Sequence, residues 1–88
     1  MFSILLTNKA KKQLLKLTPD LHARIEMLLE AIEKWPVPAN EYDLKKIKGE
    51  TDTYRIRISS YRIVYKVYWK NKTIGVAKIE RRSETTYE

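Results

Sequence analysis

The segment Tyr54-Arg55-Ile56-Arg57-Ile58 alternates apolar and basic side chains without interruption. Successive side chains of a β-strand point to opposite faces of a sheet, so this alternation predicts a strand with one buried and one charged face. Ser59-Ser60 marks a turn, and residues 61–69 form a longer run that is dense in Tyr, Ile, Val and Trp. Because so short a turn joins them, the two strands must be antiparallel.

Two further strands are predicted, one on each side of this hairpin in the chain. Downstream, Asn71-Lys72 makes a turn and residues 73–79 run back as another antiparallel strand. Upstream, residues 44–48 are a short strand candidate that Gly49 closes. Residues 80–88 are polar, and no element is predicted there.

The N-terminal half has helical periodicity instead. Residues 2–7 read as a short strand, after which Asn8 offers a helix cap. Apolar residues at helical spacing indicate one helix that stops near Thr18 and a second that has Pro19 at its first position. Pro36 ends the second helix, because proline disfavours helix in the residue before it. The tight link between the two helices predicts an αα-hairpin.

The predicted fold class is therefore α+β, with an N-terminal strand, an αα-hairpin and then a mostly antiparallel sheet, in the order β-α-α-β-β-β-β. The helices should cover one face of the sheet and leave the other only partly covered. A chain of 88 residues is too short for two hydrophobic cores, so residues 1–88 are expected to form one domain.

The charge of the chain is concentrated in its C-terminal half. The formal net charge is +7, and residues 44–82 carry twelve basic side chains against three acidic ones. Such an excess favours a polyanionic partner, which leaves nucleic acid and an acidic protein as alternatives.

The residues that are missing exclude several mechanisms. The chain has no cysteine and one histidine, which excludes a disulfide scaffold, a thiolate zinc site, a cysteine nucleophile and any mechanism that needs two imidazoles. No apolar run approaches the roughly 20 residues of a membrane-spanning helix. A cytoplasmic location is expected.

Strand alternation gathers the positive charge on one face of the sheet. If the apolar faces align, Arg55, Arg57, Arg62 and Lys66 all lie on the uncovered side, with Tyr68 nearby. Guanidinium groups clamp phosphates and planar side chains stack on unpaired bases, so this surface suits RNA. The alternative is that these are ordinary exposed strand residues, because charged outer faces are common in antiparallel sheets.

The motifs Lys46-Ile47-Lys48-Gly49, Tyr54-Arg55-Ile56-Arg57-Ile58 and Tyr61-Arg62-Ile63-Val64-Tyr65 resemble the RelE/ParE toxin superfamily, and RelE-type toxins in particular. The resemblance spans the whole chain. It implies the toxin of a type II toxin–antitoxin module that cleaves mRNA in the ribosomal A site. The reaction it implies is a ribose 2′-OH attack without metal or other cofactor, blocked by a cognate RelB-type antitoxin.

The resemblance also implies roles for individual residues. Arg55 and Arg57 match two basic strand positions of the family's active site, and Arg62 matches the arginine that stabilises the transition-state phosphate. Arg81 matches a C-terminal catalytic arginine, although a one-residue gap would select Arg82. Tyr87 matches a tyrosine that stacks on the mRNA base. The further candidates for RNA binding are Lys46, Lys48, Lys66 and Arg82.

One departure bears on the mechanism. The best-studied bacterial member has lysines where this chain has Arg55 and Arg57. An arginine essentially cannot lose its proton, so an electrostatic role is assigned to both residues and the general base is left open.

Two other functions fit the same residues. A ParE-like toxin of this fold would bind DNA gyrase and would not cut RNA, since a fold does not fix a function. An inactive binding module would only pair with an acidic protein, which the positive half would attract as readily as RNA.

Overall fold

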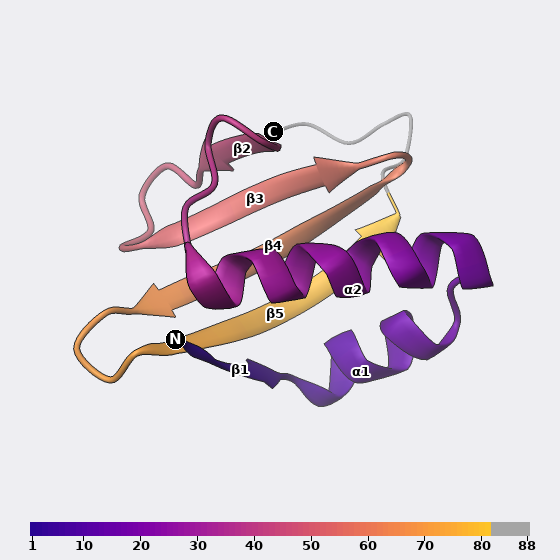
Figure 1. Cartoon of the computed structure of the whole chain (residues 1–88), viewed down its shortest axis with the longest axis horizontal. Helices are drawn as coiled ribbons and strands as arrows, with labels where there is room; N and C mark the ends of the chain where they lie inside the picture. Colours follow the sequence, from indigo (N-terminus) through magenta and orange to yellow (C-terminus); the bar gives the residue numbers. More distant parts are fainter. Residues whose placement is uncertain (82–88) are drawn as a thin grey trace.

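The computed structural model describes residues 1–81, which form a five-stranded sheet and two helices (Figure 1). The strand order is β1-β5-β4-β3-β2. This architecture confirms the predicted α+β fold and its order of elements. The elements are β1 (Ser3–Leu6), α1 (Asn8–Leu15), α2 (Pro19–Lys34), β2 (Asp43–Lys46), β3 (Thr53–Ile58), β4 (Tyr61–Tyr68) and β5 (Thr73–Arg81).

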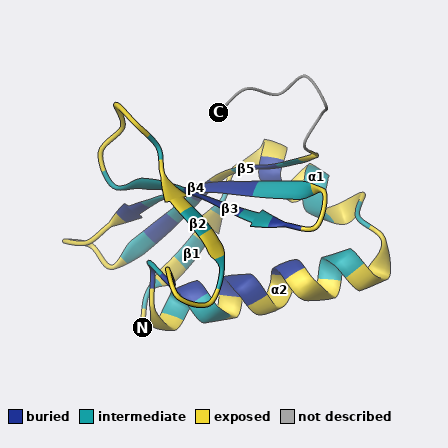
Figure 2. Cartoon of the chain, turned by 90° about the horizontal axis from the view of Figure 1, so that it is seen from above, coloured by how far each residue is buried: buried dark blue, intermediate teal, exposed yellow. Residues whose placement is uncertain are grey.

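The hydrophobic core lies between α2 and one face of the sheet (Figure 2). The buried face of α2 consists of Ile25, Leu28, Leu29 and Ile32, which repeat at helical spacing. Tyr65 of β4 is fully buried and donates a hydrogen bond from its hydroxyl to the Pro36 carbonyl at 2.6 Å. Burial raises the pKa of Tyr65, and the neighbouring Tyr54 raises it further, so the hydroxyl keeps its proton. This bond ties the segment after α2 to the sheet.

The N-terminal strand occupies a position that the sequence did not predict. β1 lies at the edge of the sheet and pairs in parallel with β5, while the other neighbouring strands are antiparallel. β5 is longer than β1, and Thr7 and α1 form hydrogen bonds with part of the remaining edge of β5. The Thr7 hydroxyl donates to the Ala77 carbonyl at 2.7 Å, and the Ile79 N–H donates to Gln13 Oε1 at 2.8 Å.

A β-bulge changes the phase of β5. Val64 pairs with Lys78 whereas Tyr65 pairs with Val76, so Ala77 is an extra residue on β5. Without it, strict alternation would place Lys78 on the face of the buried Val76. The bulge turns Lys78, and Glu80 two residues later, to the face away from α2.

One local prediction was wrong. The cap of α1 is Thr7 and not Asn8, which is already helical. The Thr7 side chain accepts a hydrogen bond from the Ala10 N–H at 3.1 Å, as an N-cap residue does. Pro19 begins α2, as predicted, and Thr18 is the N-cap residue of this helix, but the Thr18 side chain makes no capping hydrogen bond.

These two threonines form a matched test. We predict that Thr7→Ala lowers the free energy of unfolding by about 1–2 kcal/mol, because it removes both the cap and the bond to β5. Thr18→Ala should cost no more than about 0.5 kcal/mol. Urea denaturation of the two variants measures the difference, and equal losses would contradict the role assigned to Thr7.

Candidate nucleic-acid interface

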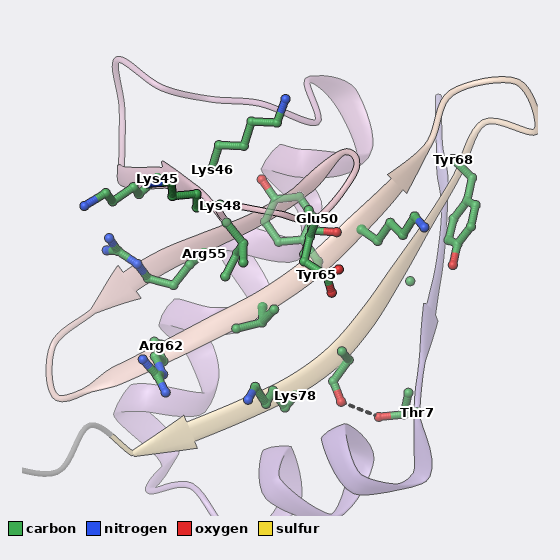
Figure 3. Close-up of a pocket in the computed structure, with 16 residues that line it drawn as sticks. Thr7, Lys45, Lys46, Lys48, Glu50, Arg55, Arg62, Tyr65, Tyr68 and Lys78 are labelled. Carbon is green, nitrogen blue, oxygen red and sulfur yellow. Dashed lines mark hydrogen bonds between the residues drawn. The ribbon is translucent and has the colours of Figure 1, made fainter. Parts of the chain in front are cut away.

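The face of the sheet opposite α2 is hollowed into a cavity of about 800 Å³ (Figure 3). Strands β2 to β5 and the loop between β2 and β3 supply most of its walls. Its only acidic lining residue in the described part of the chain is Glu50, whereas seven lining residues are basic. These are Lys45, Lys46, Lys48, Arg55, Arg62, Lys66 and Lys78.

One row of charges crosses four strands at the end of this face. Strand register places Asp43 opposite Arg57, Arg57 opposite Arg62, and Arg62 opposite Glu80. Two arginines directly opposite each other on neighbouring strands repel. A carboxylate at each end of the row offsets this repulsion, so the order of charges is negative, positive, positive, negative.

The contact between Arg62 and Glu80 is the tightest in this row. Arg62 Nη2 lies 2.6 Å and Arg62 Nε 2.8 Å from the same oxygen, Glu80 Oε1. Lys78 Nζ lies 3.6 Å from that oxygen. Burial alone would raise the pKa of Glu80, but the hydrogen bond from Arg62 and the charges of Lys78 and Arg62 outweigh burial and lower it. The ionised carboxylate therefore holds the guanidinium in one orientation.

The next row of the sheet has more positive charge. Here Lys45 lies opposite Arg55, Arg55 opposite Val64, and Val64 opposite Lys78, with no carboxylate in the row. The Arg55 side chain is 6% exposed, and its Nη1 lies 3.7 Å from Asp43 Oδ1 in the neighbouring row. A nearly buried guanidinium among further cations creates a strong positive potential in the cavity.

The structure brings five of the predicted site residues together and separates others. Arg57 lines a separate hollow of about 350 Å³ with Asp43 and Arg24, and its Nη1 lies 4.0 Å from Asp43 Oδ2. Arg81 pairs with Tyr61 and so shares the face of the sheet that packs on the core, not the face of Arg62. Arg82 and Tyr87 lie outside the described residues. The five that line the cavity are Lys46, Lys48, Arg55, Arg62 and Lys66.

Sequence reasoning missed the two carboxylates of this face, Asp43 and Glu80. Asp43 directly precedes the predicted strand 44–48, so extending that strand by one residue would have placed it near the arginines. Glu80 had no comparable signal, because its face depends on the bulge at Ala77.

Within residues 1–81, no three His, Asp or Glu side chains gather where they could hold a metal ion. No helix of that part of the chain is both long and apolar enough to cross a membrane.

Glu80 makes the stability of the fold depend on pH. The pKa of this carboxyl is lower in the folded chain than in the unfolded chain. The ionised carboxylate therefore raises the free energy of unfolding at neutral pH, and this gain is lost as pH falls through the folded pKa. We predict that Glu80→Gln has a lower free energy of unfolding than the parent chain at neutral pH and that this difference becomes smaller in acid. Urea denaturation of both chains from neutral to acid pH measures the difference.

Glu30→Gln is the matched control, because Glu30 is exposed on α2. The ion pair would be contradicted if the difference in free energy of unfolding between Glu80→Gln and the parent stayed constant down to about pH 3. That pH is well below the ordinary pKa of glutamate.

The chain is similar to known proteins in sequence and in fold. The family model described as the ParE toxin of the type II toxin–antitoxin system, parDE, matches residues 4–86. A curated protein of Methanocaldococcus jannaschii named "Putative toxin RelE1" is 32% identical over 81 residues, which are 92% of this chain and 90% of that protein.

The fold of this chain also matches solved structures. The archaeal RelE–RelB complex from Pyrococcus horikoshii OT3 contains a chain with 29% identity and a TM-score of 0.86, and the match covers 96% of this chain and 98% of that one. The isolated E. coli RelE toxin superposes with a TM-score of 0.83 at 22% identity, over 97% of this chain and 88% of that one, which shows the shared fold. The chain therefore belongs to the ParE toxin family of type II toxin–antitoxin systems and is a toxin of the RelE type.

Proposed function

We propose that this toxin is a metal-independent endoribonuclease that cleaves mRNA in the A site of the ribosome, in the cytoplasm. The observation that carries the proposal is the Arg62 guanidinium, which Glu80 holds in one orientation at the wall of a cavity lined by six further basic side chains. A pre-oriented cation is suited to a phosphate that gains negative charge during reaction.

The proposed reaction cuts the RNA strand by internal attack. The ribose 2′-oxygen bonds to the adjacent phosphorus while the bond from phosphorus to the 5′-oxygen breaks. A proton leaves the 2′-OH and another reaches the departing 5′-oxygen, so the products are a 2′,3′-cyclic phosphate and a 5′-OH end. Arg62 and Arg55 stabilise the charge that builds up on the phosphorane oxygens.

The other site residues keep the roles that the family resemblance implies. Arg57 lies opposite Arg62 and acts from the neighbouring hollow. One of Arg81 and Arg82 supplies the last catalytic cation, and Arg81 can do so only if its side chain reaches around the end of β5 from the core face. Tyr87 stacks on the base beside the cut. Phosphates on either side contact the remaining candidates, which are Lys46, Lys48 and Lys66, and also Arg82 if Arg81 is the catalytic arginine. Comparing Arg81→Ala with Arg82→Ala separates the two arginines, and the catalytic one is the one whose loss lowers kcat.

We also propose a RelB-type antitoxin as the partner of this chain. The structure from P. horikoshii is a complex of RelE with RelB, and the positive cavity here would attract an acidic peptide. Expression together with the neighbouring reading frame should yield a stable complex. If no small acidic protein purifies with the toxin, this part of the proposal is wrong.

Gyrase is the second candidate target. The family model that matches the chain is named for ParE toxins, which supports this alternative. A gyrase poison would trap cleaved DNA in an assay with purified gyrase and supercoiled plasmid. The proposed nuclease should leave that reaction unchanged.

Arg62→Ala tests the nuclease directly. On ribosomes programmed with a defined mRNA, we expect kcat to fall by about 100- to 1000-fold, since one transition-state donor is lost. Arg62→Lys should recover only part of the rate, because an ammonium lacks the planar fork of donors. Primer extension on the mRNA measures both.

Two further variants control this experiment. Lys12→Ala removes an exposed cation from α1, outside the cavity lining, and should cleave like the parent. The double variant Arg62→Ala/Glu80→Gln also removes the charge of the carboxylate that would otherwise lose its tightest partner, in case the single variant is unstable. Cleavage within threefold of the parent by a folded Arg62 variant would overturn the assignment.

A further inference from the structure

Tyr68 stands out among the exposed apolar side chains of the described residues. Seven large apolar side chains in this part of the chain are exposed, and Tyr68 is the only one of them that lines the cavity. It is the last residue of β4 and lies among the residues that line the cavity (Figure 3). Its exposed fraction is 45%. An aromatic ring that is open to solvent and surrounded by cations is a feature of surfaces that bind single-stranded nucleic acid.

The neighbours of Tyr68 hold the ring close to the sheet. A Cβ atom at Gly75 would lie 3.4 Å from Cε2 of the ring, so the ring edge lies in contact with β5 at this glycine. Lys66 Nζ lies over the face of the ring, 5.3 Å from its centroid. A base that stacks on this face therefore displaces the ammonium group, which stays within reach of the phosphate of the same nucleotide.

This position is remote from the proposed chemistry. Tyr68 and Arg62 are six residues apart on β4 and therefore on the same face, about 20 Å from each other. A nucleotide at Tyr68 is thus not the nucleotide that is cut at Arg62. The row that contains Lys45, Arg55 and Lys78 lies between them and offers cations to the phosphates of the connecting strand.

We propose that Tyr68, Lys66 and Gly75 form a nucleobase-stacking subsite that holds an unpaired base of the mRNA several nucleotides from the cut. This inference rests on the proposed function, since it assumes an RNA substrate. It is separate from the role given to Tyr87, which concerns the base beside the cut. The mRNA strand would then run along β4 from Arg62 to Tyr68.

The test uses ribosomes programmed with a set of mRNAs. Each mRNA carries one abasic residue, at successive positions of the A-site codon and of the three nucleotides after it. We expect Tyr68→Ala to raise KM about 5- to 150-fold on the intact mRNA, the range for loss of one stacked base, with little change in kcat. Tyr68→Phe keeps the ring and should stay within twofold of the parent.

The abasic mRNAs identify the stacked base. On the one mRNA that lacks it, the parent and Tyr68→Ala should have the same KM. Trp35→Ala is the matched control, because it removes another exposed aromatic side chain that lies outside the cavity lining. Its KM should equal that of the parent.

Three results would overturn the subsite. The first is a Tyr68→Ala variant that cleaves like Trp35→Ala, and the second is a KM penalty that persists on every abasic mRNA. The third is a variant with unchanged cleavage and weakened binding to the antitoxin, which would assign the ring to a protein partner. Failure of the proposed function is distinguishable, because the parent chain itself would then leave the mRNA intact.

Discussion

Two arginines lie opposite each other on neighbouring strands, and opposite charges on both sides have to offset their repulsion. The pair of Arg57 and Arg62 would destabilise the pairing of β3 with β4 if it stood alone. Asp43 on β2 and Glu80 on β5 extend the row by one residue at each end and supply the opposite charge. The positive face of this toxin is therefore compatible with a stable sheet, and the same contacts orient the guanidinium groups.

The rows along the sheet divide the face into three zones. Charges in the first row are paired, with Arg62 held by Glu80. The second row is cationic and has a nearly buried Arg55 at its centre. In the third zone Lys66 lies opposite Gly75, and both residues are close to the exposed ring of Tyr68. An extended polyanion with planar bases matches this succession better than a compact anion would, because each zone offers a different kind of contact along one strand direction.

Much of this arrangement could be predicted from the sequence, because strand alternation is a local property. The pattern of residues 54–58 was enough to place Arg55 and Arg57 on one face, and the antiparallel hairpin then brought Arg62 to the same face. The parallel pairing of β1 with β5 could not be predicted, since it joins the two ends of the described chain. The bulge at Ala77 could not be predicted either, and therefore neither could the face on which Glu80 lies. The Ala77 carbonyl accepts a hydrogen bond from the Thr7 hydroxyl, which is 70 residues away in sequence, so no local signal accompanies the bulge.

We propose that the positive face of the sheet cuts mRNA, and the most direct test is to map the 5′ ends of cellular transcripts after a short pulse of toxin expression, with selective ligation of 5′-OH ends. We expect new 5′-OH ends within translated codons, and none when the pulse expresses Arg62→Ala. Growth arrest by the parent chain without any new 5′-OH ends in translated mRNA would contradict mRNA cleavage by this face.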